Sequence, residues 1–254
     1  MNIIIKTLIF CFYSVVLLAR SEGETEITTE EGIEVFQNEK YYILKKNVKI
    51  ESDNFILNAD DVKINFDKNL YDITELDANG NVTFHSQEYE MKGLGDILKF
   101  EVKIEKLKLL GKGSVLMLQE IEMYSDGSIE VNNLSGNFIL KGLNSKLVTD
   151  NILIKANSIN GTFSDESEKK EITSLNVVDE KISYIKNNDT EMYAKKINFN
   201  NESSIIELID DVTIIRNDEK ITGDYGTLDT TNDSYKIKSN NKSKVKVIIQ
   251  NNDQ

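Results

Sequence analysis

From residue 33 onward, apolar and polar residues alternate along most of the chain. Val48 and Ile50 lie two positions apart, and Val62, Ile64 and Phe66 keep the same spacing. Successive side chains of a β-strand point to opposite faces, so this period of two predicts strands with one buried face. The same alternation occurs in Phe55, Leu57 and Ala59, in Val82 and Phe84, in Leu107 and Leu109, in Ile152 and Ile154, in Ile182 and Tyr184, in Ile197 and Phe199, in Val212 and Ile214, and in Val245, Val247 and Ile249.

Short groups of turn-forming residues divide these alternating segments. Glycine, asparagine and aspartate accept the backbone angles that tight turns require, so such groups predict strand ends. The groups are DKN at 67–69, NGN at 79–81, GKG at 111–113, SDG at 125–127, NG at 160–161 and ND at 217–218. Beyond residue 32 no long stretch keeps the i, i+3, i+4 apolar spacing of a helix, so we predict an all-β fold with little helix.

The chain also repeats itself. IEVFQNEKYYILK at 33–45 matches IEVNNLSGNFILK at 129–141, DNFILNADDVKINF at 53–66 matches DNILIKANSINGTF at 150–163, and ITELDANGNVTF at 73–84 matches ITSLNVVDEKISY at 172–184. Such self-similarity indicates a duplicated β-rich unit. We therefore predict an acidic leader at 22–32, a first half at 33–118, a second half at 119–249 and a polar tail at 250–254.

A shorter motif recurs within this duplication. It places a polar or glycine-containing pair before a valine, as in KNVKI at 46–50, GNVTF at 80–84, GSVLM at 113–117 and DVTII at 211–215. We expect the pair to turn the chain into a strand whose valine faces inward, as for Val48, Val82 and Val115. A small residue followed by aspartate, at Ala59-Asp60, Gly95-Asp96 and Gly223-Asp224, predicts strand bends in which the aspartate closes a turn.

Residues 1–21 are predicted to be a signal peptide. A single Lys6 precedes an apolar run that ends at Leu18, and Ala19-Arg20-Ser21 supplies small residues at a cleavage site. The alternative is an uncleaved inner-membrane anchor in which Lys6 reaches back to the interface. Cys11, the single cysteine of the chain, lies inside the apolar run, so the mature protein is expected to have no thiol, disulfide or thiolate metal ligand.

Charge and composition exclude several function classes. The chain has 43 acidic and 30 basic residues and a net charge of −13, which repels phosphate backbones and argues against a nucleic-acid partner. No G-x-S-x-G, G-x-x-x-x-G-K-S/T or G-x-G-x-x-G motif is present, so hydrolysis by a serine nucleophile and nucleotide binding are unsupported. His85, the single histidine, stands in a polar run without a recognisable partner. We predict no catalytic residues, metal or cofactor, and no enzyme activity.

The repeated motifs resemble a known family. An apolar leader, a β-only chain, the recurring G-N-V-x-hydrophobic and Ala/Gly-Asp steps, and the stretch KITGDYGTLDTTNDSYKI at 220–237 are similar to the OstA-like proteins of lipopolysaccharide export, most closely the LptA family. The resemblance covers nearly the whole chain after the leader and is clearest at 46–84 and 211–237. It implies a twisted, antiparallel, jelly-roll-like β-stack of OstA type, with an apolar interior that is open along its length.

The resemblance implies a periplasmic carrier or bridge that binds lipopolysaccharide, or a related lipid, and moves it from the inner to the outer membrane without covalent chemistry. The alternating apolar positions are candidates for the walls of such a trough. The alternative is that each of these residues fills an ordinary closed core. The predicted lipid-binding positions are Val48, Ile50, Leu57, Val62, Ile64, Phe66, Leu76, Val82 and Phe84 in the first half, and Ile152, Ile154, Ile159, Phe163, Leu175, Val212 and Ile214 in the second.

The first and last strands are candidate open edges. We expect Ile33 and Val35 near the start, and Val245, Val247 and Ile249 near the end, to pair between molecules and to give head-to-tail oligomers. The chain contains no proline to block such edges, although Lys242, Lys244 and Lys246 flank the last strand. The family resemblance implies further partners, namely inner-membrane LptC-like and outer-membrane LptD-like OstA proteins, with an ATP-driven partner supplying direction.

Three other functions are compatible with a repeated β-sequence. An LptC-like component of the same export system would keep its N-terminal segment as a membrane anchor. A secreted β-helical enzyme that cleaves polysaccharides would also show many short strands, but it would need a focused charged cleft. A surface adhesin or scaffold would show no lipid binding.

Overall fold

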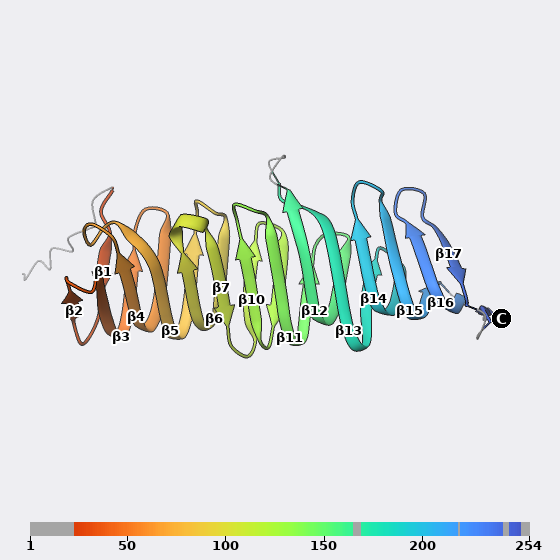
Figure 1. Ribbon diagram of the computed structural model, residues 1–254, viewed down its shortest axis with the longest axis horizontal. Helices are drawn as coiled ribbons and strands as arrows, with labels where there is room; N and C mark the ends of the chain where they lie inside the picture. The colour runs from red at the N-terminus through yellow and green to blue at the C-terminus, as the bar shows by residue number, and fades with distance from the viewer. Residues whose placement is uncertain (1–22, 165–168, 218, 241–243, 250–254) are drawn as a thin grey trace, which may run out of the picture.

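The computed structural model describes residues 23–164, 169–217, 219–240 and 244–249 (Figure 1). The predicted signal peptide with Cys11, and the polar tail at 250–254, lie outside the described residues. The described part consists of strands and one short 3-10 helix, η1 (Val102–Ile104). The strands are β1 (Glu26–Thr28), β2 (Ile33–Phe36), β3 (Tyr41–Glu51), β4 (Phe55–Phe66), β5 (Ile73–Ser86), β6 (Met91–Glu101), β7 (Lys106–Leu110), β8 (Ser114–Leu118), β9 (Ile121–Ser125), β10 (Ser128–Asn132), β11 (Asn137–Val148), β12 (Ile152–Ser164), β13 (Glu171–Asn187), β14 (Thr190–Asn200), β15 (Ile205–Arg216), β16 (Glu219–Asp229), β17 (Ser234–Lys238) and β18 (Lys246–Ile249).

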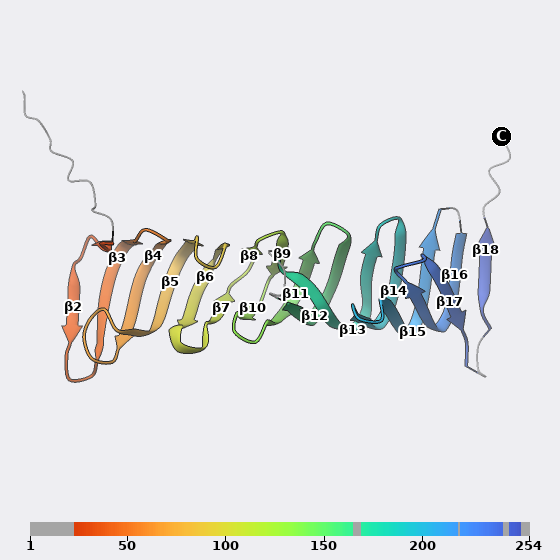
Figure 2. The ribbon, with the colours of Figure 1, turned by 90° about the horizontal axis from the view of Figure 1, so that it is seen from above.

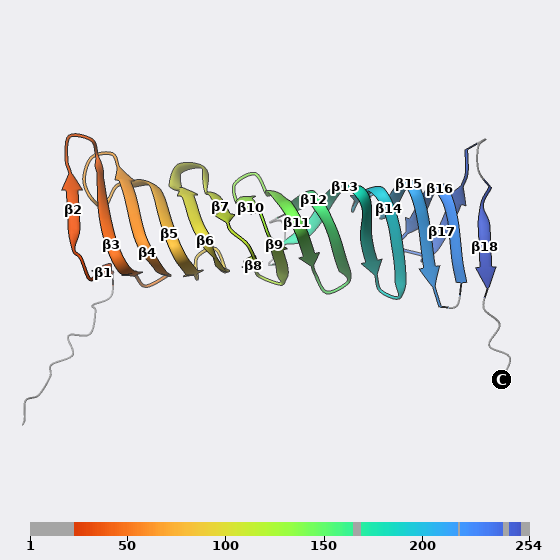
Figure 3. The same cartoon turned by 90° about the horizontal axis from the view of Figure 1, so that it is seen from below.

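The strands stack side by side into an elongated array, with β1 and β2 at one end and β17 and β18 at the other (Figures 1, 2 and 3). Every pairing along the array is antiparallel, and all the strands belong to one continuous sheet. The prediction of an all-β, antiparallel, jelly-roll-like stack is therefore confirmed. The length of the array comes from the serial addition of similar strands, as the internal repetition of the sequence predicts.

Most of the long strands bend near their middle, and the two arms of each belong to two different walls. Pairing between β3 and β4 lapses between Lys45 and Val48, and pairing between β4 and β5 lapses between Asn58 and Asp61. At the centre of the array the two walls are built from separate strands, because the arms of β6 pair with β7 and with β8. The arms of β11 likewise pair with β10 and with β9.

We name the walls after these central strands. The β7 wall runs through β2, β3, β4, β5, β6, β7, β10, β11, β12, β13, β14, β15, β16 and β17. The β8 wall runs through β1, β3, β4, β5, β6, β8, β9, β11, β12, β13, β14, β15, β16 and β18. Strands present in both walls contribute one arm to each.

The bends are made by consecutive residues in the left-handed backbone region. Gly80 and Asn81 have φ angles of 77° and 49°, and Lys46 with Asn47, and Asp210 with Asp211, repeat the pattern. Asparagine, aspartate and glycine adopt this region most readily. A β-carbon on Gly80 would lie 2.1 Å from the carboxylate of Asp60, and Asn81 Nδ2 donates to that carboxylate at 2.9 Å. The Ala59-Asp60 step thus braces the bend of the neighbouring strand.

Several predictions of turns and of inward-facing residues are wrong. NGN at 79–81 lies inside β5 and NG at 160–161 lies inside β12, because these residues bend or pack a continuous strand instead of ending it. Val48 and Val82 face inward as predicted, but Val115 faces outward between the buried Ser114 and Leu116. Ser183 and Ile185, rather than Ile182 and Tyr184, face the core, because this segment has apolar residues on both faces and Tyr184 packs outside against Tyr193.

One apolar core runs between the walls. It is formed by the inward-facing residues of both arms, which pack as a single cluster. Each predicted trough position is buried except Ile152, which is half-buried and packs against the same cluster. The buried positions are Val48, Ile50, Leu57, Val62, Ile64, Phe66, Leu76, Val82, Phe84, Ile154, Ile159, Phe163, Leu175, Val212 and Ile214.

The two ends of the array leave this apolar row uncovered. Ile33 and Val35 of β2 pair opposite the buried Leu44 and Tyr42, so they continue the inward face, yet they are exposed. At the other end, Val247 and Ile249 of β18 are 53% and 61% exposed. β2 belongs to the β7 wall, whereas β18 belongs to the β8 wall, so the two edges predicted to pair with each other lie in different walls. The preceding Val245 is exposed just outside β18.

The outer face of the β7 wall carries a polar ladder that predicts a pH dependence of stability. Asn198 Nδ2 donates to Glu207 at 2.8 Å, and the Tyr225 hydroxyl donates to the other carboxylate oxygen at 2.8 Å. These hydrogen bonds, Asn198 first, hold the pKa of Glu207 below its ordinary value. Ionised Glu207 therefore stabilises the fold above its unfolded pKa of about 4.3, and this contribution is lost as pH falls through the folded pKa.

Replacing Glu207 by glutamine tests this linkage. We expect Glu207→Gln to lower the free energy of unfolding at pH 7 by about 0.5–1.5 kcal/mol, the ordinary net value of a hydrogen bond. The difference from the unchanged protein should shrink as the pH falls below 4. Urea unfolding at several pH values measures both quantities, and a difference that is constant with pH would contradict the assignment.

Candidate functional site

An apolar slot opens between the two walls in the first half of the array. Its volume is about 360 Å³, within the range of ordinary ligand pockets. The β7 wall contributes Ile73, Leu76, Leu98, Phe100 and Leu107, and the β8 wall contributes Phe55, Phe84, Ser86 and Met91. Tyr71, Asp72, Tyr89, Val102, Glu105 and Asn133 complete the lining from the connecting segments.

The slot lies where strands begin and end, at the mouth of the two walls. Phe55 and Ile73 open β4 and β5, and Phe100 stands one residue before the end of β6. The ring of Phe100 meets the ring of Tyr89 edge to face, with centroids 6.2 Å apart. Bends deep in the array and aromatic side chains at the strand ends therefore leave the walls apart at this mouth.

Polar groups at the rim of the slot are paired with one another. Asn133 Nδ2 donates to Glu105 at 2.8 Å, and Ser86 Oγ accepts the backbone N–H of Tyr89 at 3.3 Å. Burial, and then the charge of Glu105, raise the pKa of the Tyr89 phenol, so this hydroxyl is neutral at physiological pH. The slot therefore combines an apolar interior with a satisfied polar rim, an arrangement suited to hydrocarbon.

The predicted trough residues divide into three groups. Leu76 and Phe84 line the apolar slot, and Ile152 lines a second, polar pocket in the other half. The remaining predicted positions pack into the core cluster. Sequence reasoning missed the slot residues at strand ends and in connections, such as Tyr71, Tyr89 and Phe100. Aromatic residues beside turn-forming groups were the available signal, because strand ends next to turns form the rim of a two-walled stack.

The mouth of the second half is polar and is bridged between the walls. Its pocket, of about 440 Å³, is lined mainly by polar and charged side chains. At one end, Lys169 Nζ lies 2.6 Å from Glu120, and the backbone N–H of Lys170 donates to Gln119 Oε1 at 2.6 Å. Glu120 and Gln119 belong to the β8–β9 turn of the β8 wall, whereas Lys169 and Lys170 precede β13 of the β7 wall.

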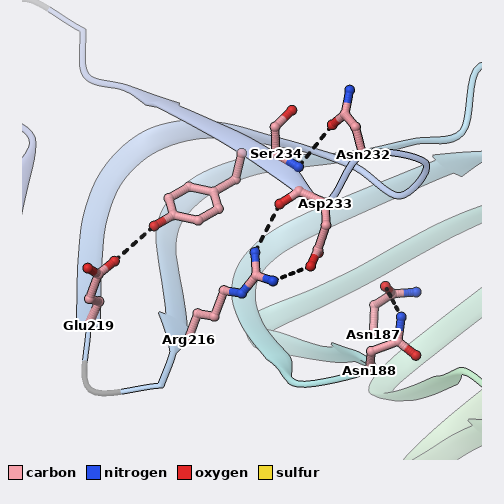
Figure 4. Close-up of polar contacts among 8 residues, drawn as sticks. Asn187, Asn188, Arg216, Glu219, Asn232, Asp233 and Ser234 are labelled. Carbon is pink, nitrogen blue, oxygen red and sulfur yellow. Dashed lines mark hydrogen bonds and ion pairs between the residues drawn. The ribbon is translucent and has the colours of Figure 1, made fainter.

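A second bridge between the walls lies further along the array, where β15 ends and β17 begins. The Arg216 guanidinium donates to the Asp233 carbonyl oxygen at 2.9 Å and also pairs with the Asp233 carboxylate (Figure 4). Beside it, the Tyr235 hydroxyl donates to Glu219 at 3.1 Å. Arg216 ends β15 in the β8 wall, and Asp233 precedes β17 in the β7 wall, so these contacts also cross the mouth.

A metal centre is the other kind of site that acidic side chains could form in the described residues. No group of three or more histidine, cysteine, aspartate or glutamate side chains there could hold a metal ion. His85 is exposed in β5, and its neighbour Phe84 faces the core. Among the described helical residues, no segment has the length and apolarity needed to cross a bilayer.

Comparison with known proteins places this geometry in a family. Residues 27–133 and 127–234 each match a family model described as LptA/(LptD N-terminal domain) LPS transport protein. No curated protein gives a significant match to the chain. Among solved structures, LptH of Pseudomonas aeruginosa, described as the LptA homologous periplasmic component of its lipopolysaccharide transport device, aligns with 16% identity and a TM-score of 0.44. That alignment covers 52% of this chain and 96% of LptH.

Proposed function

The chain belongs to the LptA/LptD N-terminal domain family of lipopolysaccharide transport proteins, and from this premise we propose that it is a periplasmic carrier that shelters lipopolysaccharide between its two walls. Its place in lipopolysaccharide transport follows from two tandem family domains that fill most of the chain. The observation that carries the proposal is the apolar slot between the walls of the first half. No covalent step is required of such a carrier.

The energetic need for a slot is large. Exposing hydrocarbon to water costs about 0.8 kcal/mol per methylene, so an acyl chain of about a dozen carbons costs on the order of 10 kcal/mol. Leu76, Leu98 and Phe100 from one wall, with Phe84 and Met91 from the other, offer apolar contacts on both sides of a chain placed between them. The predicted core positions beyond the slot, among them Ile64 and Ile154, would line the continuation of the trough if the walls separate further.

A direct binding experiment tests the carrier function. Purified protein, with residues 1–21 removed, is incubated with radiolabelled lipopolysaccharide and separated by size exclusion without detergent. We expect lipopolysaccharide to co-elute with the protein, and we expect the same saccharide without its acyl chains not to compete. Equal competition by the deacylated saccharide, or no co-elution at all, would contradict the proposal.

The exposed ends support a bridge built from several copies. Because each pairing along a wall is antiparallel, β2 and β17 of the β7 wall run in opposite directions, as do β1 and β18 of the β8 wall. A second copy in the same orientation can therefore place its β2 against β17 and its β1 against β18. This joint covers Ile33 and Val35 at one end, and Val245, Val247 and Ile249 at the other, and it aligns the two troughs.

Cysteine pairs distinguish this joint from other contacts. Glu34→Cys with Lys236→Cys places thiols on the outer faces of β2 and β17, and no cysteine remains in the chain after residue 21. We expect this variant to oxidise into dimers and longer ladders at high protein concentration. The matched pair Glu34→Cys with Ile248→Cys, whose strands lie in different walls, should not. Ladders from the second pair alone, or from neither pair, would contradict the joint.

The N-terminus distinguishes the bridge from its nearest rival. A bridge component released into the periplasm would begin at Glu22 after cleavage behind Ser21, whereas an LptC-like component would keep Met1 and remain in the inner membrane. Sequencing the N-terminus of the exported protein separates these outcomes. A bridge would contact an LptC-like protein at one end and an LptD-like protein at the other through the same type of edge pairing.

A further inference from the structure

The mouths of the two halves differ in chemistry. The first mouth is bordered by the lip residues Tyr71, Val102 and Ile104, which come from the β4–β5 connection and from η1. Tyr71 is 90% exposed and Ile104 is 41% exposed, although both are large and apolar in most of their surface. Tyr71 and Val102 also line the apolar slot. Apolar side chains of the lip therefore reach from solvent to the lining of the slot, beside the paired polar groups of its rim.

At the second mouth, polar groups lie between solvent and the space between the walls. Lys170 Nζ donates to Asn133 Oδ1 at 3.1 Å and lies 4.6 Å from the centre of the Phe163 ring, so it covers the end of the core with a charge. The Lys169–Glu120 and Arg216–Asp233 bridges connect the two walls in this half. A hydrocarbon chain entering here would have to displace these contacts and cross a polar chamber.

Resting on the proposed function, we propose that the acyl chains of the lipid enter the trough sideways, over the lip formed by Tyr71, Val102 and Ile104, and that the second half receives them only along the trough. A chain that enters over this lip contacts Tyr71 and Val102 before it reaches the apolar interior of the slot. Tyrosine suits such a position because its ring is apolar while its hydroxyl remains in water. The bridges of the second half individually stabilise little at an exposed site, but together they keep the walls closed.

The rate of loading tests the route, and the final occupancy tests the carrier function. Phosphatidylethanolamine vesicles that contain fluorescent lipopolysaccharide are mixed with the unchanged protein or with the variant Ile104→Ser, whose changed residue does not line the slot. We expect the variant to load about threefold more slowly, because the substitution removes apolar contact from the entry path. Its final occupancy should match that of the unchanged protein.

A matched control and an opposite variant complete the test. Leu143→Ser removes an exposed leucine from β11 at the bend, away from the mouth, and should leave the rate unchanged. The double variant Arg216→Ala, Asp233→Ala removes an ion pair between the two walls of the second half. It should accelerate loading by less than twofold. An unchanged rate in the lip variant, or strong acceleration on opening the bridge, would overturn the lateral route while leaving the carrier intact. No occupancy in any protein would overturn the carrier function itself.

Discussion

Phe100→Asp is expected to weaken the binding of an acyl-chain ligand by about 10- to 100-fold. A buried phenylalanine side chain contributes about 1.5–3 kcal/mol through the apolar surface it covers, and a carboxylate in the slot must also be desolvated by the ligand. Phe100 is only partly buried at the mouth, so the substitution should leave the fold intact. Fluorescence titration with a lipid A analogue measures the affinity.

Two comparisons make this result specific. Phe100→Leu keeps an apolar side chain in the slot, so it should restore most of the affinity. Thermal unfolding should show that Phe100→Asp retains a cooperative transition close to that of the unchanged protein. Unaltered affinity in a folded Phe100→Asp protein would mean that the ligand lies elsewhere, and the slot would then be ordinary interior.

Phe138→Ala is expected to cause the largest loss of stability, about 3–5 kcal/mol. Phe138 is almost fully buried near the centre of the array, and its ring stacks on that of Phe163 with centroids 6.2 Å apart. Gly161 leaves the space that this ring fills, because a β-carbon there would lie 2.4 Å from the Phe138 ring. Alanine at position 138 would therefore leave a cavity that the rigid pairing of β11 and β12 cannot close.

An aromatic residue at the end of the array provides the matched control. Phe36 in β2 stacks on Tyr41 with centroids 4.6 Å apart, but it is only half-buried on an edge strand. Phe36→Ala should cost roughly 1 kcal/mol, since little surrounding structure packs on it. Urea unfolding compares the two variants, and equal losses would contradict a single core whose packing is tightest at the centre.

Much of the fold could be predicted because each strand repeats a simple pattern. Alternation at Val48 and Ile50, or at Val62 and Ile64, correctly indicated one inward face, since a strand in a two-walled stack needs only one apolar face. The duplicated segments also indicated two similar halves. The inward valines of the KNV and GNV motifs follow from the two left-handed residues that precede them, which asparagine and glycine tolerate.

The failures arise where the facing of a residue depends on side chains of neighbouring strands. Gly161 was predicted to be a turn residue but makes room for Phe138 inside β12, a long-range packing demand that a local pattern cannot reveal. In β13 the segment from Ile182 to Ile185 carries apolar residues on both faces, so alternation alone could not show that Ile185, rather than Tyr184, faces the core. β2 and β18 lie in different walls because of the order in which the central strands β7 to β10 pair. Local alternation does not predict that order.

The candidate site was harder to locate than the core. Interior positions such as Leu57 and Val212 were found because burial follows alternation, but a closed core and a lipid trough have the same pattern. What distinguishes the slot is a separation of the walls at their mouth, bordered by Tyr71, Tyr89 and Phe100. That separation depends on where the strands bend and on the volumes of side chains from both walls. Because these side chains come from distant segments, no single stretch of the sequence predicts it.

Photo-crosslinking from adjacent positions tests the central claim that hydrocarbon lies between the walls. Residue 100 faces the slot, whereas Lys99 faces outward and pairs with Asp77, so the two positions differ in facing but not in location. A photoreactive amino acid is introduced at position 100 or at position 99, and living cells are irradiated. We expect lipopolysaccharide adducts from position 100 and few or none from position 99. Equal adduct yields at both positions, or none at position 100, would contradict it.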